Sequence, residues 1–410
     1  MAALTRRQVY RRRRIVVFGG LFAVLAGLTY LPLTLLAPVT ETDAVVSPPQ
    51  VETPAAAVTS LPGYGASAIA AIDEEGVLAQ SGATAPLPMA SITKVITALV
   101  VLDAHPLAPG ESGPSITMTS TDVGYYRDYL ARNGSVKPVR PGQVYTEREL
   151  LELMLIPSAN NYSKSLAVWA FGSMDAYLGA ARAWLDAHGL PGVQVVDSSG
   201  LDERSAATAT ELIHLGKLAL AHPVVAEIVA MSSSTVSNIG QVENTNKLLG
   251  INGIDGIKTG TLDGANLLFS ASITVGPREI ELVGVVLDGP DHATINDAIR
   301  SMVEQVQAGF HQVPLVTAGQ VVAEYSTPWG DEADAVAAHD ASVVVWGDTP
   351  VTAQATAREI RLAEKGEEVG ELVFTAGPHT VTVPLVLAHD VEDPGPWWRL
   401  GHPEIIFGMG

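Results

Sequence analysis

The stretch INGIDGIKTGTLDGANLLFSASITVGPREIELVGVVLDG, residues 251–289, decides the fold. It holds three strand-like runs, INGIDGIKTGT, NLLFSASITV and EIELVGVVLDG, separated by the turn signals LDGA and GPR. Short turns between such runs predict neighbouring antiparallel strands. The amphipathic segment DAIRSMVEQVQAGF follows them and predicts a closing helix. We therefore expect an antiparallel sheet with a terminal helix.

Further strands and a helical region precede this stretch. The segment ASAIAAIDEEGVLAQSG, residues 66–82, predicts two short strands around a turn at Glu74-Glu75-Gly76. A helix-rich region is expected from Ser91 to about Ala230. Strands, then helices, then an antiparallel sheet indicate an α+β fold in which a helical lobe is inserted in a sheet lobe.

One helix of that lobe has explicit boundary signals. The run Thr146-Glu147-Arg148-Glu149 matches a capping box, and the apolar LLELMLI follows it. Pro157 is expected to end the helix, since the residue before a proline avoids helical backbone angles.

The sequence after residue 312 changes character. Short alternating runs such as GQVVAEY, ASVVVWG, EEVGELVFTA and HTVTVPLVLA are separated by Gly, Pro and Asp. They predict a separate small β-rich C-terminal domain over residues 313–410.

The N-terminus has the features of a membrane anchor. Residues 1–14 contain six arginines and no acid, and residues 15–36 contain no charged side chain. An apolar helix of this length spans a bilayer, and the positive-inside rule keeps the basic tail in the cytoplasm. We expect a single-pass protein of the cell membrane with everything after the span outside the cytoplasm; a buried core helix with a basic flank is the alternative. Residues 37–62, rich in Pro, Thr and Ala, are expected to form a linker, or else a poorly ordered terminus.

Composition excludes several functions. The net charge is −20 even with the basic tail included, and the Lys and Arg residues after the tail are scattered. Because phosphate binding needs clustered Lys and Arg, this argues against nucleic acid as a partner. There is no cysteine, which excludes thiol nucleophiles and thiolate metal sites. The ten histidines show no metal-ligand spacing and no glycine-rich phosphate loop occurs. We expect neither a metal nor a cofactor.

Ser91 and Lys94, in PMASITKVIT at residues 88–97, form the first candidate catalytic pair. If a helix starts at Ser91, the i, i+3 spacing stacks the amine beside the hydroxyl. A lysine activates a serine only if its pKa is lowered toward neutrality by burial or by another cation. The alternative is a surface lysine one turn after a capping serine.

Two further motifs follow. Ser158-Ala159-Asn160 lies between two helical patterns, where a hydroxyl and an amide can point into a cleft; alternatively, Ser158 or Asn160 is the N-cap of the next helix. Lys258-Thr259-Gly260 ends a predicted strand. The lysine supplies a cation, the threonine a hydroxyl, and the glycine leaves room for a substrate backbone along the strand edge. An ordinary exposed edge strand protected by a lysine is the alternative.

In this order the three motifs resemble the signature of active-site serine penicillin-binding enzymes and β-lactamases. The segments PMASITKVITALV, VRPGQVYTERELLELMLIPSANN, DSSGLDERSAATATEL and ENTNKLLGINGIDGIKTGTLDGANLLFSA each resemble the D-alanyl-D-alanine carboxypeptidases, the low-molecular-weight penicillin-binding proteins. The resemblance implies a β-lactamase/transpeptidase-like domain over residues 63–312. The C-terminal β-domain resembles that family more loosely.

The resemblance also implies a mechanism. Ser91 would attack the bond between two D-alanines of a peptidoglycan stem peptide, with Lys94 taking its proton and Lys258 helping to keep Lys94 neutral. Ser158 would relay the proton to the leaving amine, and Asn160 would hold the acyl side-chain amide. The remaining residues implied to bind substrate are Thr259, Gly260 and Thr261, with the backbone N–H groups of Ser91 and Thr261 forming the oxyanion hole. β-Lactams would be trapped on Ser91.

Three features depart from the family pattern. Asn161 stands where an aspartate often follows Ser-x-Asn, and GPDHATIND lacks the arginine that often helps to grip the substrate carboxylate. Arg300 and His292 are candidates to replace it; otherwise they are a solvated helix arginine and a turn histidine. The C-terminal WWRLGHPEIIFGMG is too short and irregular for the amphipathic anchor helix of other members.

Other functions on the same fold stay open at this point: a β-lactamase, a DD-endopeptidase, or a non-catalytic domain that binds cell-wall peptide. A class A β-lactamase adds a deacylating glutamate between the second and third motifs. That interval contains Glu203, Glu211, Glu227 and Glu243, none in a recognisable pattern.

Overall fold

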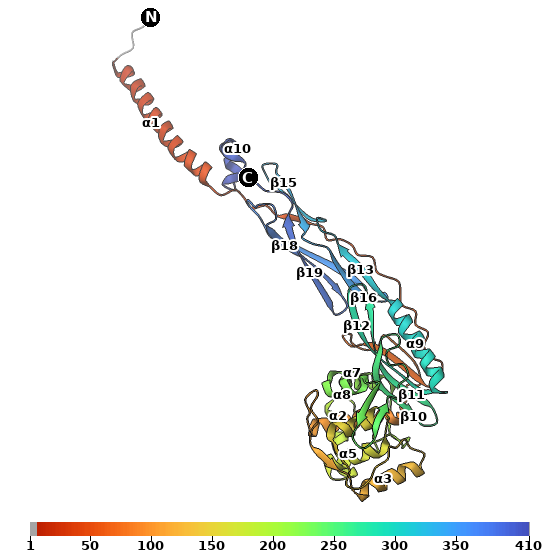
Figure 1. Ribbon diagram of the computed structural model, residues 1–410. Helices are drawn as coiled ribbons and strands as arrows, with labels where there is room; N and C mark the ends of the chain where they lie inside the picture. The colour runs from red at the N-terminus through yellow and green to blue at the C-terminus, as the bar shows by residue number, and fades with distance from the viewer. Residues whose placement is uncertain (1–5, 410) are drawn as a thin grey trace. The chain divides into compact units, whose positions relative to one another are not determined.

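The computed structural model describes residues 6–409, and the chain divides into two compact units (Figure 1). The first unit is formed by Ala55–His311; it holds all of the predicted site residues and for that reason is here called the catalytic unit. The second unit, here called the β unit, is formed by Gln312–Gly410 together with the chain up to Pro54.

The catalytic unit contains one antiparallel sheet in the strand order β10-β11-β12-β2-β3. Its strands are β2 (Ala66–Ala71), β3 (Ala79–Gly82), β10 (Ile254–Thr261), β11 (Ala265–Val275) and β12 (Arg278–Gly289). Helix α9 (His292–Gly309) follows β12. The three strands expected within residues 251–289, the two expected within 66–82 and the closing helix are thus confirmed.

Both faces of this sheet are covered, since successive side chains of a strand point to opposite faces and successive residues of β11 are buried. Leu268 and Val283 belong to the apolar core that the sheet shares with the helical lobe. A Cβ on Gly216, in helix α7 (Ala209–Ala221), would lie 2.5 Å from the Val283 side chain. Leu267 and Phe269, neighbours of Leu268 in β11, are fully buried as well. The sheet is therefore a rigid layer whose edge strand β10 can position side chains.

The helical lobe lies between β3 and β10 in the sequence. Its helices are the 3₁₀ turn η1 (Ala90–Ile92), α2 (Thr93–Ala104), α3 (Ser120–Ala131), α4 (Glu147–Leu155), α5 (Asn160–Phe171), α6 (Met174–Ala187), α7 (Ala209–Ala221) and α8 (Pro223–Ala230). Short strand pairs join them: β4 (Leu87–Pro88) with β7 (Ala206–Ala207), β5 (Ser115–Thr117) with β6 (Val144–Thr146), and β8 (Ser233–Val236) with β9 (Gly240–Glu243). The α+β fold with an inserted helical lobe is confirmed.

Local signals placed α4 correctly. Thr146 caps it, accepting from the Glu149 backbone N–H at 3.2 Å while the Glu149 carboxylate accepts from the Thr146 N–H at 2.8 Å. The helix ends at Leu155, two residues before Pro157.

The β unit is built from an antiparallel sheet of order β1-β14-β15-β19-β18-β17 and the pair β13 and β16. Its strands are β13 (Phe310–Val316), β14 (Val321–Ser326), β15 (Glu332–Ala337), β16 (Ala341–Trp346), β17 (Val351–Ala357), β18 (Glu368–Ala376) and β19 (His379–Leu387). The four quoted runs correspond to β14, β16, β18 and β19. The β-rich character of this region is confirmed.

The expected linker over residues 37–62 is wrong in part. Ala44–Val46 forms strand β1, which pairs with β14 in the register Ala44↔Tyr325. Thr42 bridges Ile360, its N–H donating to the Ile360 carbonyl at 2.7 Å. A short run with two valines suits a half-buried strand, and an open sheet edge offers unpaired backbone groups to it.

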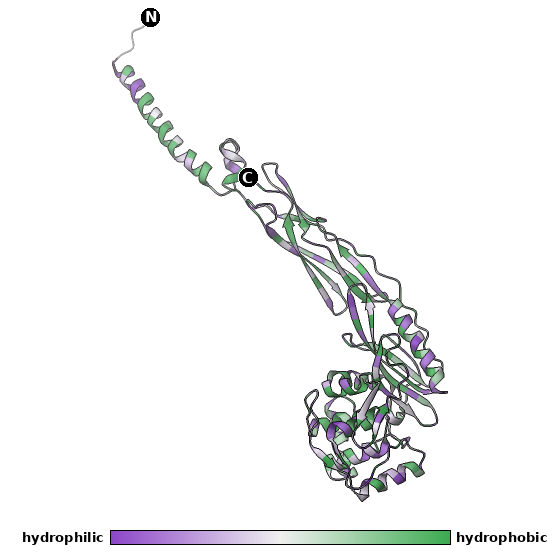
Figure 2. Cartoon of the chain, viewed as in Figure 1, coloured by the Kyte–Doolittle hydropathy of each residue, from purple (hydrophilic) through white to green (hydrophobic). Residues whose placement is uncertain are grey.

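The N-terminal helix α1 runs from Arg6 to Leu36, starting earlier than the expected residue 15 because arginines are good helix formers. It is long and apolar enough to cross a membrane, and Figure 2 shows its hydrophobic residues following the hydrophilic start. The described C-terminal residues form two short helices, α10 (Gly395–Gly401) and α11 (Pro403–Ile406).

Candidate active site

Ser91 and Lys94 meet at the junction of η1 and α2. The expectation of an α-helix beginning at Ser91 is wrong in detail: Ser91 lies in the 3₁₀ turn, and α2 begins at Thr93. In a 3₁₀ turn the side chains at i and i+3 eclipse one another, which brings the two together. Lys94 Nζ lies 2.7 Å from Ser91 Oγ in a hydrogen bond. Lys94 is fully buried and Ser91 half-buried, so the alternative of a surface lysine is excluded.

A second contact fixes the Lys94 amine. Lys94 Nζ donates to the backbone carbonyl of Ser199 at 3.0 Å. Asp197 Oδ1 shapes this loop by accepting from the N–H groups of Ser199 and Gly200, each at 2.5 Å. Gly200 has φ +75°, and a Cβ there would lie 1.8 Å from the Ala90 carbonyl oxygen. Sequence reasoning missed this role, although Asp-Ser-Ser-Gly is a typical turn sequence.

The pKa values of the two buried lysines are low. Burial, and next the nearby Lys258 ammonium, hold the pKa of Lys94 well below its usual range, although Asp197 acts in the opposite direction. Burial lowers the pKa of Lys258 to about 7. A neutral amine at position 94 can accept a proton from the Ser91 hydroxyl, as a general base must.

Ser91 opens into a cleft of about 470 Å³ between the helical lobe and β10. The residues that line it are Ser91, Ser135, Ser158, Glu243, Asn244, Thr245, Lys247, Thr259, Gly260, Thr261 and His292. Four of the predicted site residues besides Ser91 therefore line the same cleft as Ser91.

Ser158 lines the cleft and does not cap a helix. The N-cap of α5 is Ala159, with no side-chain capping bond, so the alternative that Ser158 or Asn160 caps this helix is wrong. Ser158 has φ +62°, a backbone conformation uncommon outside glycine. It is only 5 % exposed but reaches the cleft wall.

Asn160 and Asn161 differ in their contacts. Asn160 is buried beside the cleft and is absent from its lining, and its Oδ1 has no hydrogen-bond partner among the described residues. A buried amide oxygen without a partner is costly, which suits an acceptor reserved for a ligand. Asn161 pairs with the backbone of Lys137 through two bonds of 3.1 Å. Its role is therefore to hold a neighbouring loop.

β10 supplies the far wall. It is an edge strand of the sheet, so one side of its backbone is open to an added strand. Thr259 Oγ1 is 2.6 Å from Thr245 Oγ1. A Cβ on Gly260 would lie 2.9 Å from the Met89 carbonyl oxygen, so glycine lets β10 approach η1 closely. The Lys258 amine is buried behind this wall, 3.2 Å from the Thr259 carbonyl oxygen.

His292 joins the site at the start of α9. Its Nε2 is 2.7 Å from Thr261 Oγ1. Burial and next Lys258 lower the pKa of His292, against the opposing effect of Asp291. Arg300, in contrast, is half-exposed and pairs with Asp297 on its own helix, which confirms its reading as a solvated helix arginine.

The four glutamates between the second and third motifs, considered above for the deacylating role of a class A β-lactamase, lie in different parts of the unit. Glu211 completes the capping box of α7, and Glu227 pairs with Arg148. Glu203 lines a small separate pocket. Glu243 reaches the cleft but is largely exposed, with Lys247 Nζ 3.9 Å from its carboxylate.

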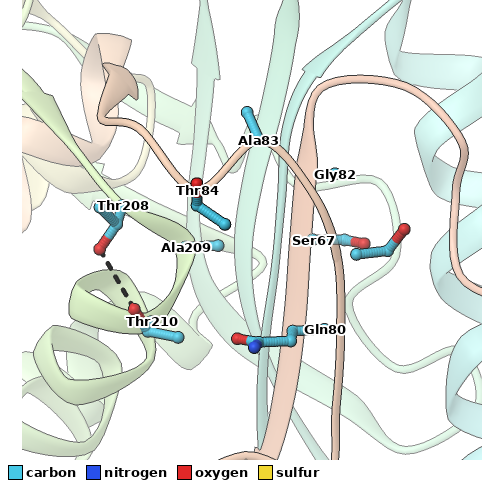
Figure 3. A pocket seen from close by; sticks show the side chains of 9 residues that line it. Ser67, Gln80, Gly82, Ala83, Thr84, Thr208, Ala209 and Thr210 are labelled. Carbon is cyan, nitrogen blue, oxygen red and sulfur yellow. Dashed lines mark hydrogen bonds between the residues drawn. The ribbon is translucent and has the colours of Figure 1, made fainter.

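A second cleft of the catalytic unit, of about 440 Å³, lies between the edge strand β3 and the start of α7 (Figure 3). Ser67, Gln80, Thr84, Thr208 and Thr210 are among its lining residues, and Thr208 Oγ1 lies 3.2 Å from Thr210 Oγ1. Its lining holds no titratable side chain.

Comparison with known sequences agrees with this geometry. Residues 57–291 match a family described as D-alanyl-D-alanine carboxypeptidase, peptidase family S11. The chain is 31 % identical over 231 residues to D-alanyl-D-alanine carboxypeptidase DacB2 of Mycobacterium tuberculosis, covering 54 % of this chain and 75 % of the relative. It is 28 % identical over 341 residues to D-alanyl-D-alanine carboxypeptidase DacC of Escherichia coli, covering 79 % of this chain and 83 % of the relative.

Solved structures share the fold. A peptidoglycan synthesis regulatory factor (PBP3) from Streptococcus pneumoniae aligns with TM-score 0.58 at 23 % identity, covering 80 % of this chain and 98 % of that one. Penicillin binding protein 5 from Haemophilus influenzae aligns with TM-score 0.57 at 19 % identity, covering 85 % and 100 %. Because the family match spans more than half of the chain and includes Ser91, Ser158 and Lys258, this chain belongs to the D-alanyl-D-alanine carboxypeptidase family.

Proposed function

We propose that this chain hydrolyses the bond between the two terminal D-alanines of peptidoglycan stem peptides, through an acyl-enzyme on Ser91. The observation that carries the proposal is the 2.7 Å contact between Ser91 Oγ and the buried amine of Lys94, at the mouth of a cleft. Membership of a carboxypeptidase family supplies the reaction class.

In the acylation step Ser91 Oγ attacks the carbonyl carbon of the penultimate D-alanine while Lys94 takes its proton. The substrate backbone lies along the open edge of β10, with the backbone N–H groups of Ser91 and Thr261 donating to the oxyanion. Losing one such donor typically costs about 3–4 kcal/mol of transition-state stabilisation. Ser158 passes the proton to the departing amine, and water then releases the shortened peptide from Ser91.

Substrate recognition uses the groups around the nucleophile. The unpartnered amide oxygen of Asn160 accepts from the peptide N–H that joins the penultimate D-alanine to the rest of the stem peptide. Thr259 and Thr261 offer hydroxyls to the substrate, and Gly260 leaves room for its backbone. His292, hydrogen-bonded to Thr261, binds the terminal carboxylate where other members of the family use an arginine.

We also propose that α1 crosses the cell membrane once, with the catalytic unit outside the cytoplasm. Its uncharged stretch, Ile15–Leu36, follows six arginines that favour the cytoplasmic side. Residues 44–46 are held in the sheet of the β unit, so the connection from the span enters folded structure within a few residues.

A fluorescent penicillin tests the assignment. The wild-type protein should be labelled stoichiometrically, and Ser91→Ala should abolish labelling while the exposed control Ser120→Ala keeps it. Persistent labelling of Ser91→Ala would refute the assignment. Mass spectrometry of a pentapeptide and of a cross-linked dimer then separates the reactions: loss of one D-alanine is expected, and cleavage of the cross-link alone would indicate an endopeptidase. Rapid turnover of a chromogenic cephalosporin would indicate a β-lactamase.

A further inference from the structure

The C-terminal residues pack against the outer end of α1. Tyr30 Oη donates to the Leu400 carbonyl at 2.7 Å, and Arg399 Nη1 donates to the Ala37 carbonyl at 2.5 Å. Thr34, between these two contacts, is fully buried, whereas its neighbours in α1 are mostly exposed. Contacts on both sides of Thr34 fix the C-terminal segment along the last turns of the helix.

The position of these contacts along α1 determines how deep in the membrane the C-terminal segment lies. Tyr30 precedes Leu36, the last residue of the helix, by six residues, which corresponds to about 9 Å at the helical rise of about 1.5 Å per residue. Amphipathic interfacial segments typically bury their apolar side by about 5–10 Å at the boundary of headgroups and acyl chains. A segment bonded to Tyr30 therefore reaches that boundary; this step rests on the proposed single span.

The side chains of this segment suit such a boundary. Trp397 is 86 % exposed, Met409 67 % and Phe407 42 %. Trp398, next to Trp397, faces the β unit instead, with its ring centroid 5.8 Å from that of Trp329. An exposed tryptophan presents a large apolar ring with one polar N–H, which is why tryptophan is enriched at membrane interfaces.

The charges of the segment do not oppose insertion. Arg399 is buried and forms an ion pair with Asp393, so its charge is compensated within the fold. Glu404 is the acid of α11. With little net charge left over, attraction to lipid comes from the apolar side chains and requires no particular headgroup.

We propose that residues 395–409, here called the C-terminal foot, lie in the headgroup layer of the outer leaflet beside α1, with Trp397, Phe407 and Met409 in contact with lipid. The occupant of this apolar surface is lipid because the surface is continuous with a helix whose own exposed residues, Leu33 and Leu36 among them, face the bilayer. The foot thereby holds the β unit at the membrane surface.

Quenching by brominated lipids tests the foot. The full-length chain is placed in phosphatidylcholine nanodiscs, with bromine either near the headgroup end or deep in the acyl chain. Shallow bromine should quench part of the tryptophan emission, and Trp397→Ser should reduce the quenched fraction by about half or more, since few tryptophans lie at the interface. Trp169→Phe, in the catalytic unit, should leave unchanged the amount of emission that is lost to shallow bromine.

Two results would overturn the proposal: an absence of quenching by shallow bromine, or equal quenching in Trp397→Ser and in the wild type. If the foot instead binds a partner protein or a second copy of this chain, it should not contact lipid in a nanodisc that holds a single chain. Shallow bromine would then cause no quenching, which is the first of these results. Retention of the chain in membranes after an alkaline carbonate wash tests the span separately, so failure of the foot and failure of the anchor are distinguishable. Labelling by fluorescent penicillin confirms that each variant is folded.

Discussion

The two units differ in whether their buried ionisable side chains are paired with an opposite charge. The catalytic unit buries Lys94 and Lys258 completely, although neither has a carboxylate as hydrogen-bond partner, and it buries Glu147 with both carboxylate oxygens unpartnered among the described residues. The β unit has an apolar core, and its buried Arg399 is neutralised by Asp393. Burying an uncompensated charge is costly, so a fold keeps one where chemistry requires it. The two buried lysines lie beside the cleft at Ser91, so this difference between the units agrees with the proposed site.

Replacement of the buried amine should have the largest effect. Lys94→Met keeps an apolar chain of similar length but removes the general base, so acylation should fall by about 10²–10⁴-fold, the usual contribution of such a base. The rate of labelling by fluorescent penicillin measures it. The exposed control Lys365→Met in the β unit should acylate at the wild-type rate, and a Lys94→Met rate within a few-fold of wild type would break the comparison.

His292 should have a smaller effect that depends on the substrate. Removing a hydrogen bond to a charged group typically costs about 1.5–3 kcal/mol, so His292→Ala should raise KM for a peptide with a free C-terminal carboxylate by about 10-fold or more. The matching C-terminal amide should be affected little, and His292→Arg should restore the preference for the free carboxylate. Equal losses on acid and amide would show a structural role; Arg300→Ala serves as the control.

Glu147 should make the stability of the catalytic unit dependent on pH. Burial, and next the nearby Glu111, raise the pKa of Glu147 to about 7, above its usual value when unfolded. The folded state therefore loses stability as pH rises from the unfolded pKa to about 7, and the loss is complete above that. Glu147→Gln should increase the free energy of unfolding by about 1–3 kcal/mol at pH 8 and change it little at pH 4. Urea unfolding in detergent at the two pH values measures the difference.

Glu149, on the same helix, is the matched control with the opposite sign. Burial opposes ionisation there, but hydrogen bonds from Ser237 and Thr146 prevail and lower the pKa of Glu149. Its stabilisation is present above the unfolded pKa and is lost as pH falls through the folded value. Glu149→Gln should therefore destabilise the protein at pH 8. A change of the same sign in both variants would contradict this account.

The smallest effect is expected in the β unit. Tyr325 is buried, and its hydroxyl donates to the Arg358 carbonyl at 2.6 Å. Tyr325→Phe leaves that carbonyl without its partner and should lower the free energy of unfolding by about 1 kcal/mol. Penicillin labelling should stay at the wild-type rate, because the site lies in the other unit. A slowed acylation would show that the units do not act separately.

Patterns within short segments predicted much of the fold. The alternation in residues 251–289 predicted β10, β11 and β12 because side chains of a strand alternate between faces. The capping box at Thr146 predicted the start of α4. The strand Ala44–Val46 was missed, since a run of three residues becomes a strand only when a sheet edge is present to pair with it.

The sequence could predict those parts of the candidate site that depend on residue type and on short spacing along the chain. Ser91 and Lys94 are three positions apart, so a single turn brings them together. The Ser199 carbonyl that holds Lys94, and His292 beside Thr261, come from segments about 100 and 30 positions away, as their hydrogen bonds show. Local patterns do not report such distant contacts.

The sequence by itself indicated Ser91 and Lys94 as the candidate reacting pair. It determined the order of the three motifs, the strands that form the sheet and the apolar helix before them, because each depends on neighbours along the chain. The tertiary structure alone decided that Lys94 and Lys258 are buried close to one another, that the Asn160 amide oxygen has no partner in the fold, and that His292 reaches the cleft. Burial and electrostatic repulsion depend on distances in space, and folding brings together residues that the sequence holds far apart.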